Sequence, residues 1–378
     1  MTTSTATPES NKGILFLALE LSWEKWKLAF TVGRGQKPRL RSIDGRDTEA
    51  LKKEIKAAKK RFGLNPGCRV VSCYEAGRDG FWVHHFLESL GVENQIVDSA
   101  SIEVSRRKKR PKTDRIDASK LVSMLIRWLE GDEWTWSVVA VPSVEDEDAR
   151  HLHRELKTLK GEQTRISNRI KGFLAGQGVK VDKIDDSFPG WLRKVRLWDG
   201  SSIPPRLGQR ILIEFDRYRY VHQQILAVER ERRQLTKKGE RNDAVVARKL
   251  LELKAIGANG AWNISTELFA WRTFKNRKQV GSFVGLTGTP FDSGGSGREQ
   301  GIDKAGNSAI RGDLVEIAWC WVRHQPKSAL TLWFERRFGG GSKRLRKIGI
   351  VALARKLLIA LWRWVEQDIL PEGAVLKA

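Results

Sequence analysis

The sequence predicts an α/β domain at the N-terminus, a long helical coiled-coil segment after it, and a mainly α domain at the C-terminus. Short apolar runs alternate with helical stretches in the first third, two long helical periods follow, and shorter mixed segments complete the chain. A chain of 378 residues, 40% of them hydrophobic, is long enough for several packed cores. We place the domains at residues 1–135, 142–240 and 241–378.

The first domain opens with apolar runs that have the length of β-strands. The run GILFLALEL extends from Gly13 to Leu21, and LAFTV begins at Leu28 after the polar stretch SWEKWK. Two such runs in succession predict a β-hairpin, to which residues 39–43 add a third strand. The elements expected next are a helix over 48–62, a buried strand over 69–75, a helix over 81–90, a short strand over 95–97 and a helix from about Asp114. This βββαβαβ order, closed by a helix, is the order of an RNase H-like fold.

A basic loop is predicted just before the closing helix. No apolar period survives between Asp98 and Thr113, and six of the seven positions from 106 to 112 are Lys or Arg. Such a cluster favours contact with phosphates of a nucleic acid. The candidate nucleic-acid-binding residues here are Arg106, Arg107, Lys108, Lys109, Arg110 and Lys112.

The second domain is expected to be two long helices joined by a turn-rich connection over 176–205. Ser143 is placed as a helix N-cap, with acidic residues in the first turn, where the helix dipole favours them. Apolar residues then recur at the spacing of a coiled-coil seam: Leu152, Leu156, Leu159, Ile166, Ile170 and Phe173. A second period comprises Leu207, Ile211, Phe215, Tyr218, Ile225, Val228 and Leu235. Two antiparallel helices and a dimerising coiled coil fit equally well, and the coiled coil would make the chain a dimer or tetramer.

The third domain reads as globular and mainly helical. Short helices are expected around 244–254, 263–274 and 309–323, and the Gly- and Ser-rich stretch 285–306 is expected to be a loop between them. Four tryptophans that lie in apolar helical patterns are expected in the core: Trp319, Trp321, Trp362 and Trp364.

The charge balance favours a polyanionic partner. Lys and Arg number 69 against 45 Asp and Glu, so the formal net charge is +24 and the pI is about 10.1. A basic protein that merely stays soluble by self-repulsion is the alternative, but here the charge is also clustered. The first dozen residues lack the apolar segment of a signal peptide, and the apolar stretch 348–365 is interrupted by Arg355 and Lys356. We therefore expect a cytoplasmic, bacterial, nucleoid-associated protein with no membrane partner.

The cysteines and histidines do not indicate a zinc site. Cys68, Cys73 and Cys320 lack the spacing of metal ligands and are expected to be buried free thiols. None of the six histidines has a neighbouring cysteine that would complete a zinc-binding set.

Four acids in the first domain form a candidate metal site. Glu20 lies in the first strand, Glu75 ends the fourth, and Asp114 and Asp117 lie three residues apart on one helix face. Carboxylates in such a group hold two Mg²⁺ or Mn²⁺ ions about 4 Å apart, which activate one phosphate oxygen and stabilise the leaving one. Each acid taken alone is equally well a helix cap or a strand-end charge. Glu20 resists that interpretation, because an acid inside LFLALEL is costly to bury without a partner.

The order of an acid, CYEAG and then KTDRIDA resembles the DEDD transposases of the insertion-sequence one-hundred-and-ten (IS110) family, relatives of the Piv-type invertases. The resemblance covers nearly the whole chain and implies a RuvC-like first domain. Glu75, Asp114 and Asp117 match the second, third and fourth acids of the family, and Glu20 stands where most members have Asp. The resemblance further implies that this chain acts on the ends and the target of a mobile DNA element. In some members of the family, an element-encoded guide (bridge) RNA directs this reaction.

The glycine-rich segment carries the second part of the resemblance. GLTGTPFDSGGSGREQGIDKAGNSAIR, from Gly285 to Arg311, is similar to the C-terminal motif of the family, and aligning Gly285 and Gly301 places the family serine on Ser293. The resemblance implies that this hydroxyl attacks DNA and forms a phosphoserine. Ser296 is the alternative nucleophile, and Lys304 and Arg311 are candidate phosphate-binding residues. Without the resemblance, a glycine loop whose serines only satisfy turns would be the better interpretation.

Three functions remain open at this point. The first is a metal-dependent transposase or site-specific recombinase that uses both the acids and Ser293. The second is a metal-dependent DNA junction nuclease that uses the acids alone. The third is a nucleic-acid-binding protein whose catalytic site has decayed, with Glu20 as the first sign of loss.

Overall fold

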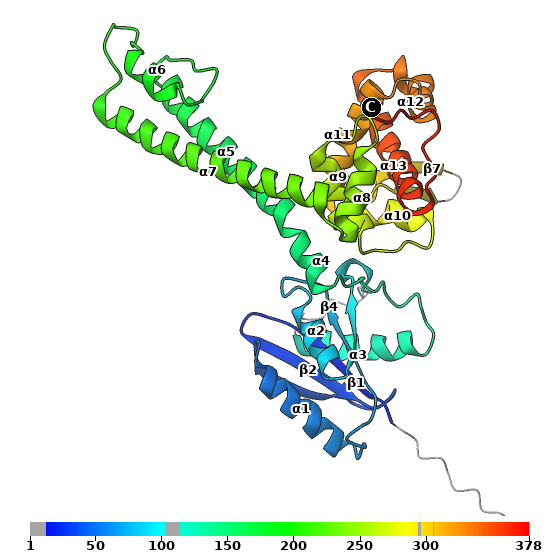
Figure 1. Ribbon diagram of the computed structural model, residues 1–378. Helices are drawn as coiled ribbons and strands as arrows, with labels where there is room; N and C mark the ends of the chain where they lie inside the picture. The colour runs from blue at the N-terminus through cyan, green and yellow to red at the C-terminus, as the bar shows by residue number, and fades with distance from the viewer. Residues whose placement is uncertain (1–12, 103–113, 294–295, 305, 378) are drawn as a thin grey trace, which may run out of the picture. The chain divides into compact units, whose positions relative to one another are not determined.

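The computed structural model describes residues 13–102, 114–293, 296–304 and 306–377 of the chain; for residues 114, 115 and 290–300 this description concerns only the backbone. The chain divides into two compact units, Met1–Val141 and Pro142–Ala378 (Figure 1). Each unit has its own hydrophobic core.

The first unit is built on a five-stranded mixed sheet. Its strands are β1 (Leu15–Glu20), β2 (Lys25–Thr31), β3 (Arg39–Asp44), β4 (Val70–Glu75) and β5 (Glu93–Val97). Their order across the sheet is β3-β2-β1-β4-β5. The first three strands form an antiparallel meander, and β4 and β5 add to β1 in parallel. The β2 strand begins at Lys25, earlier than its predicted start at Leu28, because Trp26 is fully buried in the core.

Helices cover both faces of this sheet. The helices α1 (Thr48–Arg61) and α2 (Trp82–Ser89) pack on the face that carries Leu15, Leu17 and Leu19 of β1. The helix α3 (Asp114–Leu129) packs on the opposite face, and a short 3₁₀ turn, η1 (Ser99–Ser101), follows β5. Burial on both faces explains why β1 and β4 read as continuous apolar runs.

The second unit begins with two helices that do not merge into the single predicted helix. The helix α4 (Val144–Ala149) has Ser143 as its N-cap, and the Ser143 hydroxyl accepts a hydrogen bond from the Asp146 N–H, which confirms the predicted cap. The helix α5 (His151–Ala175) starts after a turn at Arg150. The Arg150 side chain is buried beside acidic residues, and this contact accompanies the break.

The helices α5 and α7 (Pro205–Lys238) form an antiparallel pair within the chain. Their polar contacts join Lys160 to Glu229 and Arg169 to Glu214, so partner numbers fall along α7 as they rise along α5. Most of the predicted apolar residues lie in the shared core, whereas Leu235 is 39% exposed. The connection contains a further short helix, α6 (Phe188–Lys194), whose Phe188 stacks on Phe215 of α7.

The rest of the second unit is mainly helical. It comprises α8 (Asn242–Leu251), α9 (Ala258–Ile264), the π-helix η2 (Ser265–Phe269), α10 (Arg277–Phe283), α11 (Ser308–His324), α12 (Ala329–Phe334), the π-helix η3 (Glu335–Gly339) and α13 (Lys343–Gln367). The helix predicted over 263–274 actually spans α9 and η2. It begins at Ala258, after Gly257 as N-cap, and the aromatic contacts of Trp271 and Phe274 belong to the segment that follows.

Two predictions about single side chains are wrong. Trp319 is 40% exposed, although Trp321 and Trp362 are buried as expected. Cys320 is exposed, whereas Cys68 and Cys73 are buried free thiols. Within the described residues, no helix combines the length and the apolar character needed to cross a membrane.

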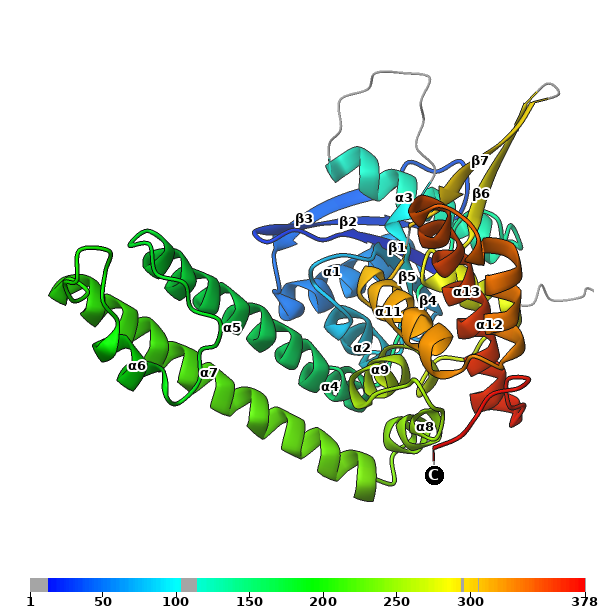
Figure 2. The same ribbon diagram turned by 90° about the horizontal axis from the view of Figure 1, so that it is seen from above.

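The Gly- and Ser-rich stretch predicted as a loop is a β-hairpin. The strands β6 (Gly288–Ser293) and β7 (Ser296–Ile302) pair antiparallel, with Ser293 opposite Ser296. Figure 2 shows the hairpin projecting away from the helices α12 and α13 of its own unit. The pairing of the two segments makes them a two-stranded ribbon, which the glycine content alone does not reveal.

Candidate functional site

Glu20 and Glu75 lie at the carboxyl ends of two neighbouring parallel strands. Leu19 of β1 pairs with Tyr74 of β4, and each acid is the next residue of its strand. Side chains alternate along a strand, so Glu20 shares a face with Ala18, and Glu75 shares a face with Cys73. Ala18 and Cys73 both lie in the core that α3 covers, so the two acids are on the α3 side of the sheet.

The helix α3 begins near these strand ends. The Cys73 thiol lies 3.8 Å from the Leu121 carbonyl oxygen, so the second turn of α3 crosses the sheet close to the end of β4. Farther along, Glu130 forms an ion pair with Arg34, just after the end of β2. Because Thr31 of β2 pairs with Phe16 at the start of β1, α3 runs antiparallel to β1. Its N-terminus, with Asp114 and Asp117, therefore approaches the edge that carries Glu20 and Glu75.

The described side chains do not by themselves complete a metal site. No three His, Cys, Asp or Glu groups among them come together as ligands, and the Asp114 side chain lies outside the description. The carboxylates of Glu20, Glu75 and Asp117 are oxygen donors of the kind that Mg²⁺ and Mn²⁺ prefer. The donor set therefore fits a divalent cation. The predicted basic residues Arg106, Arg107, Lys108, Lys109, Arg110 and Lys112 lie outside the described residues.

Ser293 lies at the outer end of the hairpin in the second unit. Ser293 ends β6 and Ser296 begins β7, so both candidate nucleophiles are at the tip rather than at the root. The acids of the first unit and this serine are thus held by separate parts of the chain.

The root of the hairpin is fixed to the end of α10 by backbone hydrogen bonds. The Asn307 N–H donates to the Phe283 carbonyl, and the Lys304 N–H donates to the Gly285 carbonyl. Gly306 has a φ of 78°, and a Cβ on it would lie 2.0 Å from the Phe283 oxygen, so only glycine fits. Lys304 itself has a φ of 64°.

The predicted phosphate ligand Arg311 has a structural contact at this root. Its guanidinium donates a 2.9 Å hydrogen bond to the Val284 carbonyl, next to Phe283. Asn307 is the N-cap of α11, and its side-chain oxygen accepts from the Ala309 and Ile310 N–H groups. These residues hold the hairpin root in place.

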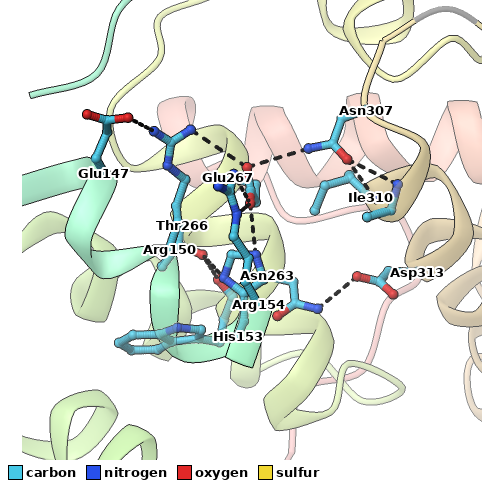
Figure 3. A network of polar contacts seen from close by, with 12 residues as sticks. Glu147, Arg150, His153, Arg154, Asn263, Thr266, Glu267, Asn307, Ile310 and Asp313 are labelled. Carbon is cyan, nitrogen blue, oxygen red and sulfur yellow. Dashed lines mark hydrogen bonds and ion pairs between the residues drawn. The ribbon is translucent and has the colours of Figure 1, made fainter. Parts of the chain in front are cut away.

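A buried polar network, not foreseen from the sequence, lies beside the root (Figure 3). Glu267 is 6% exposed, and its carboxylate accepts hydrogen bonds from His153 Nε2 at 2.8 Å and from Arg154 Nε at 2.9 Å. Asn307 Nδ2 donates to its other oxygen at 3.5 Å, and Arg150 Nη1 lies 3.9 Å away. The network thus joins the start of α5 to the η2 helix and to the hairpin root.

The ionised form of Glu267 is stabilised by these donors. Burial alone raises the pKa of this carboxyl, but the His153 hydrogen bond and the Arg154 charge outweigh burial and hold the pKa below its ordinary value. The sequence contained a signal for this residue, since Glu267 is an acid within the apolar run ISTELFAW. Glu20 is likewise an acid within an apolar run, LFLALEL.

The C-terminal part of the chain matches a known protein family. Residues 247–332 match the model of a family described as "Transposase IS116/IS110/IS902 family". This segment contains Glu267, the whole hairpin and the whole of α11.

Full-length relatives extend the match to the whole chain. "Putative transposase y4rJ" of Sinorhizobium fredii is 38% identical over 377 residues, which cover 97% of this chain and 95% of that relative. "Probable family 20 transposase" of Pseudomonas aeruginosa is 23% identical and covers 86% of this chain and 93% of its own length. "Transposase for insertion sequence element IS1328" of Yersinia enterocolitica is 25% identical over 58% of this chain and 64% of that relative.

The basic chain, its two units and these relatives define the class as a transposase of insertion sequences. More narrowly, the chain belongs to the IS116/IS110/IS902 transposase family.

Proposed function

We propose that this transposase cuts and rejoins DNA with two groups, a divalent metal held by Glu20, Glu75, Asp114 and Asp117 and a nucleophilic hydroxyl on Ser293. The observation that carries the proposal is the convergence of β1, β4 and the start of α3 at one edge of the sheet. Two of the acids end neighbouring strands there, and the other two belong to the start of the helix that leads toward these strand ends. A divalent metal shared by the four acids would account for this arrangement.

The first unit supports an RNase H-like, RuvC-like assignment. A three-stranded antiparallel meander extended in parallel by β4 and β5, in the order β3-β2-β1-β4-β5, agrees with the βββαβαβ order of that fold. The first acid on the central β1 strand, the second at the end of β4 and the last pair on the closing helix agree with it as well. Glu20 in place of Asp lengthens the first ligand by one methylene and keeps its charge.

The four carboxylates would hold Mg²⁺ or Mn²⁺. When bound, such an ion activates an attacking oxygen and neutralises charge on the phosphate that is being cleaved. The fold itself positions the carboxylates. The α3 core fixes the direction of the helix that carries Asp114 and Asp117, and the strand register fixes the spacing of Glu20 from Glu75.

Ser293 would act as the nucleophile on a DNA phosphate. Its Oγ forms a bond to phosphorus while one P–O bond to deoxyribose breaks; the serine proton leaves to a base, and the departing oxygen gains a proton. One phosphate ester replaces another, so a later attack by a DNA hydroxyl reverses the exchange and rejoins the strands. Serine is a weak nucleophile at neutral pH, so a nearby base or metal must activate it.

A guide RNA and self-association are part of the proposal. The net charge of +24 suits both DNA and an element-encoded RNA. The pair of α5 and α7 buries most of its own seam, yet Leu212, Ile213, Tyr220 and Leu226 of α7 remain exposed. These side chains support a coiled-coil contact with a second copy, and the active protein would then be a dimer or tetramer bound to the bacterial nucleoid.

The test uses purified full-length protein, Mg²⁺, a supercoiled plasmid that carries the joined ends of the element, and RNA transcribed from the flanking noncoding DNA. We expect cleavage with a protein–DNA adduct whose peptide contains Ser293. Ser293→Ala and Asp114→Ala should each abolish the adduct. Ser296→Ala, the matched control on the facing strand, should keep it.

Two other outcomes would replace the proposal. Cleavage that persists in Ser293→Ala without an adduct would indicate a junction nuclease that uses the acids alone. Tight DNA binding without cleavage, under any guide or metal, would indicate a nucleic-acid-binding protein whose catalytic site has decayed.

A further inference from the structure

The Arg272 guanidinium contacts two aromatic rings beside the hairpin root. Its central carbon is 4.1 Å from the centroid of the Phe283 ring and 4.7 Å from that of Trp271. Both rings are themselves held, because Trp271 Nε1 donates to the Thr266 carbonyl and Phe283 packs edge-on against Phe274. The two rings that the guanidinium contacts are therefore held in place before any ligand arrives.

Arg272 lacks a carboxylate partner in the described part of the chain. No hydrogen bond or ion pair to it is formed there, and its Nε is buried without an acceptor. Another cation, Arg150, lies close by, because its guanidinium contacts the same Trp271 ring at 5.3 Å. Burial, and then the positive charge of Arg150, lower the pKa of Arg272 to about 10.

The neighbouring acids are already engaged by other cations. The Glu267 carboxylate contacts the side chains of His153, Arg154 and Arg150. The Glu147 carboxylate lies 3.7 Å from the Arg150 guanidinium. The surroundings of Arg272 therefore carry an excess of positive charge. A half-buried cation in such a place is unfavourable in the free protein, and an arriving anion would relieve that cost.

We propose that Arg272 is a phosphate-binding residue for the DNA backbone, placed at the root of the hairpin that carries Ser293. Its position supports this role. Phe283 stacks on the guanidinium, and its backbone carbonyl accepts a hydrogen bond from the Asn307 N–H at the end of the hairpin segment. A phosphate bound by Arg272 would fix a strand of DNA along the ribbon that leads to Ser293.

Guanidinium chemistry favours a phosphodiester as the anion. A planar guanidinium donates two parallel N–H groups to two oxygens of one phosphate, and stacking on rings leaves its edge free to do so. A lysine ammonium can supply the charge but neither the fork nor the stacking. Arg272→Lys therefore distinguishes a site that needs the two parallel donors of a guanidinium from one that needs only a positive charge.

The test is the salt dependence of binding to a 30-base-pair duplex of arbitrary sequence, measured by fluorescence anisotropy without metal. Loss of one phosphate contact lowers the slope of log Kd against log salt by about 0.9. We expect this loss in Arg272→Met, with an affinity lower by about tenfold. Arg272→Lys should keep the slope but bind more weakly than the wild type.

Arg323→Met is the matched control. Arg323 lies in the last turn of α11 in the same unit and is exposed. Its replacement removes the same charge and should leave both slope and affinity nearly unchanged. If Arg272→Met binds DNA as the wild type does, or if the control loses as much as Arg272→Met, the proposal is wrong.

Stability separates binding from a structural role. Because no described side chain gives Arg272 an anionic partner, Arg272→Met should melt at the wild-type temperature or above it, whereas a structural arginine would lower the melting temperature by several degrees. If Arg272→Met does not fold, Arg272→Lys decides the question, since wild-type affinity in that variant would overturn the proposal.

A second ligand distinguishes the kind of nucleic acid. With a single-stranded 30-nucleotide RNA, whose phosphodiesters offer a guanidinium the same oxygens, a loss of binding confined to RNA would overturn the assignment to DNA. The inference rests on the proposed function, since DNA is taken as the substrate. The binding measurement needs neither metal nor cleavage, so its failure is distinguishable from a failure of the Ser293 reaction.

Discussion

His153 and Glu267 lie 114 residues apart in the chain, yet His153 Nε2 is 2.8 Å from the Glu267 carboxylate. The contact joins the first turn of α5 to the π-helix that precedes the hairpin segment. His153 Nδ1 also lies 3.2 Å from the Thr266 hydroxyl, so the ring is held at both nitrogens. The helix pair of α5 and α7 is therefore anchored next to the hairpin root through one buried carboxylate.

Glu267→Gln should strongly destabilise the second unit. The substitution removes the carboxylate that the buried His153 and the neighbouring Arg154 contact, and it takes one of the acidic neighbours from the buried Arg150. Removal of one partner from a buried ion pair costs about 3 kcal/mol, because the remaining charges stay desolvated. Urea denaturation followed by tryptophan fluorescence would measure this, since Trp271 contacts Arg150.

Glu155→Gln is the control for that measurement. Glu155 is an exposed acid on the same helix, α5, and its replacement should change the free energy of unfolding by less than about 0.5 kcal/mol. Equal effects of the two substitutions would show that the network contributes no more than an exposed acid does.

Stability should depend on acid pH through the same carboxyl group. The folded pKa of Glu267 lies below its ordinary value of 4.5, because the His153 and Arg154 contacts outweigh the effect of burial. A lowered folded pKa means that the unfolded chain binds the proton first. The stabilisation from Glu267 is therefore complete well above pH 4.5 and is lost as the pH falls through the folded pKa.

The comparison of wild type with Glu267→Gln isolates this contribution. The difference in their free energies of unfolding should be constant between about pH 7 and pH 5.5 and should shrink below about pH 4.5. A difference that grows toward acid pH would contradict the direction of the Glu267 shift.

Much of the first unit was predictable from sequence because its signals are local. The apolar run through Leu15 to Leu19 and the buried run through Val70 to Tyr74 have strand length and lie between turn residues. The start of β2 was misplaced because Lys25, Trp26 and Lys27 read as polar, although the cross-strand partners of β1 and β3 bury Trp26. Pairing across strands decided that boundary.

The second unit was less predictable because its decisive contacts are distant in sequence. Glycines between Gly288 and Gly301 suggested a loop, and only the pairing of β6 with β7 makes that segment a ribbon. The four acids and the two serines were predicted from their spacing, motifs and family resemblance, and they stay predictions. Glu267 and Arg272 were missed because their partners, His153 and Phe283, come together only in the folded chain.

Mg²⁺ should stabilise the folded protein through the acids of the first unit. At a concentration one hundred times its Kd, a bound ion adds about 2.7 kcal/mol to the free energy of unfolding. Thermal melting with and without Mg²⁺ measures the effect, and a chelator should reverse it. Glu75→Gln should abolish the Mg²⁺ effect while leaving the metal-free protein at least as stable, because one of several neighbouring negative charges is removed.

Glu49→Gln is the matched control for the metal. Glu49 lies on α1, which packs on the opposite face of the sheet, and is exposed. This variant should keep the full Mg²⁺ shift. A wild-type shift in Glu75→Gln would remove Glu75 from the metal site.

Gly306→Ala should displace the hairpin root and so stop any reaction that needs Ser293. An alanine Cβ at Gly306 would lie 2.0 Å from the Phe283 oxygen, and the φ of 78° disfavours any L side chain. The hydrogen bond from the Asn307 N–H to that oxygen must then break.

Gly312→Ala is the control, because Gly312 lies inside α11 with nothing within 4 Å of the added Cβ. Alanine there should raise the free energy of unfolding by about 1 kcal/mol. DNA cleavage and urea denaturation of both variants check this, and full cleavage by Gly306→Ala would mean that the hairpin acts independently of its root.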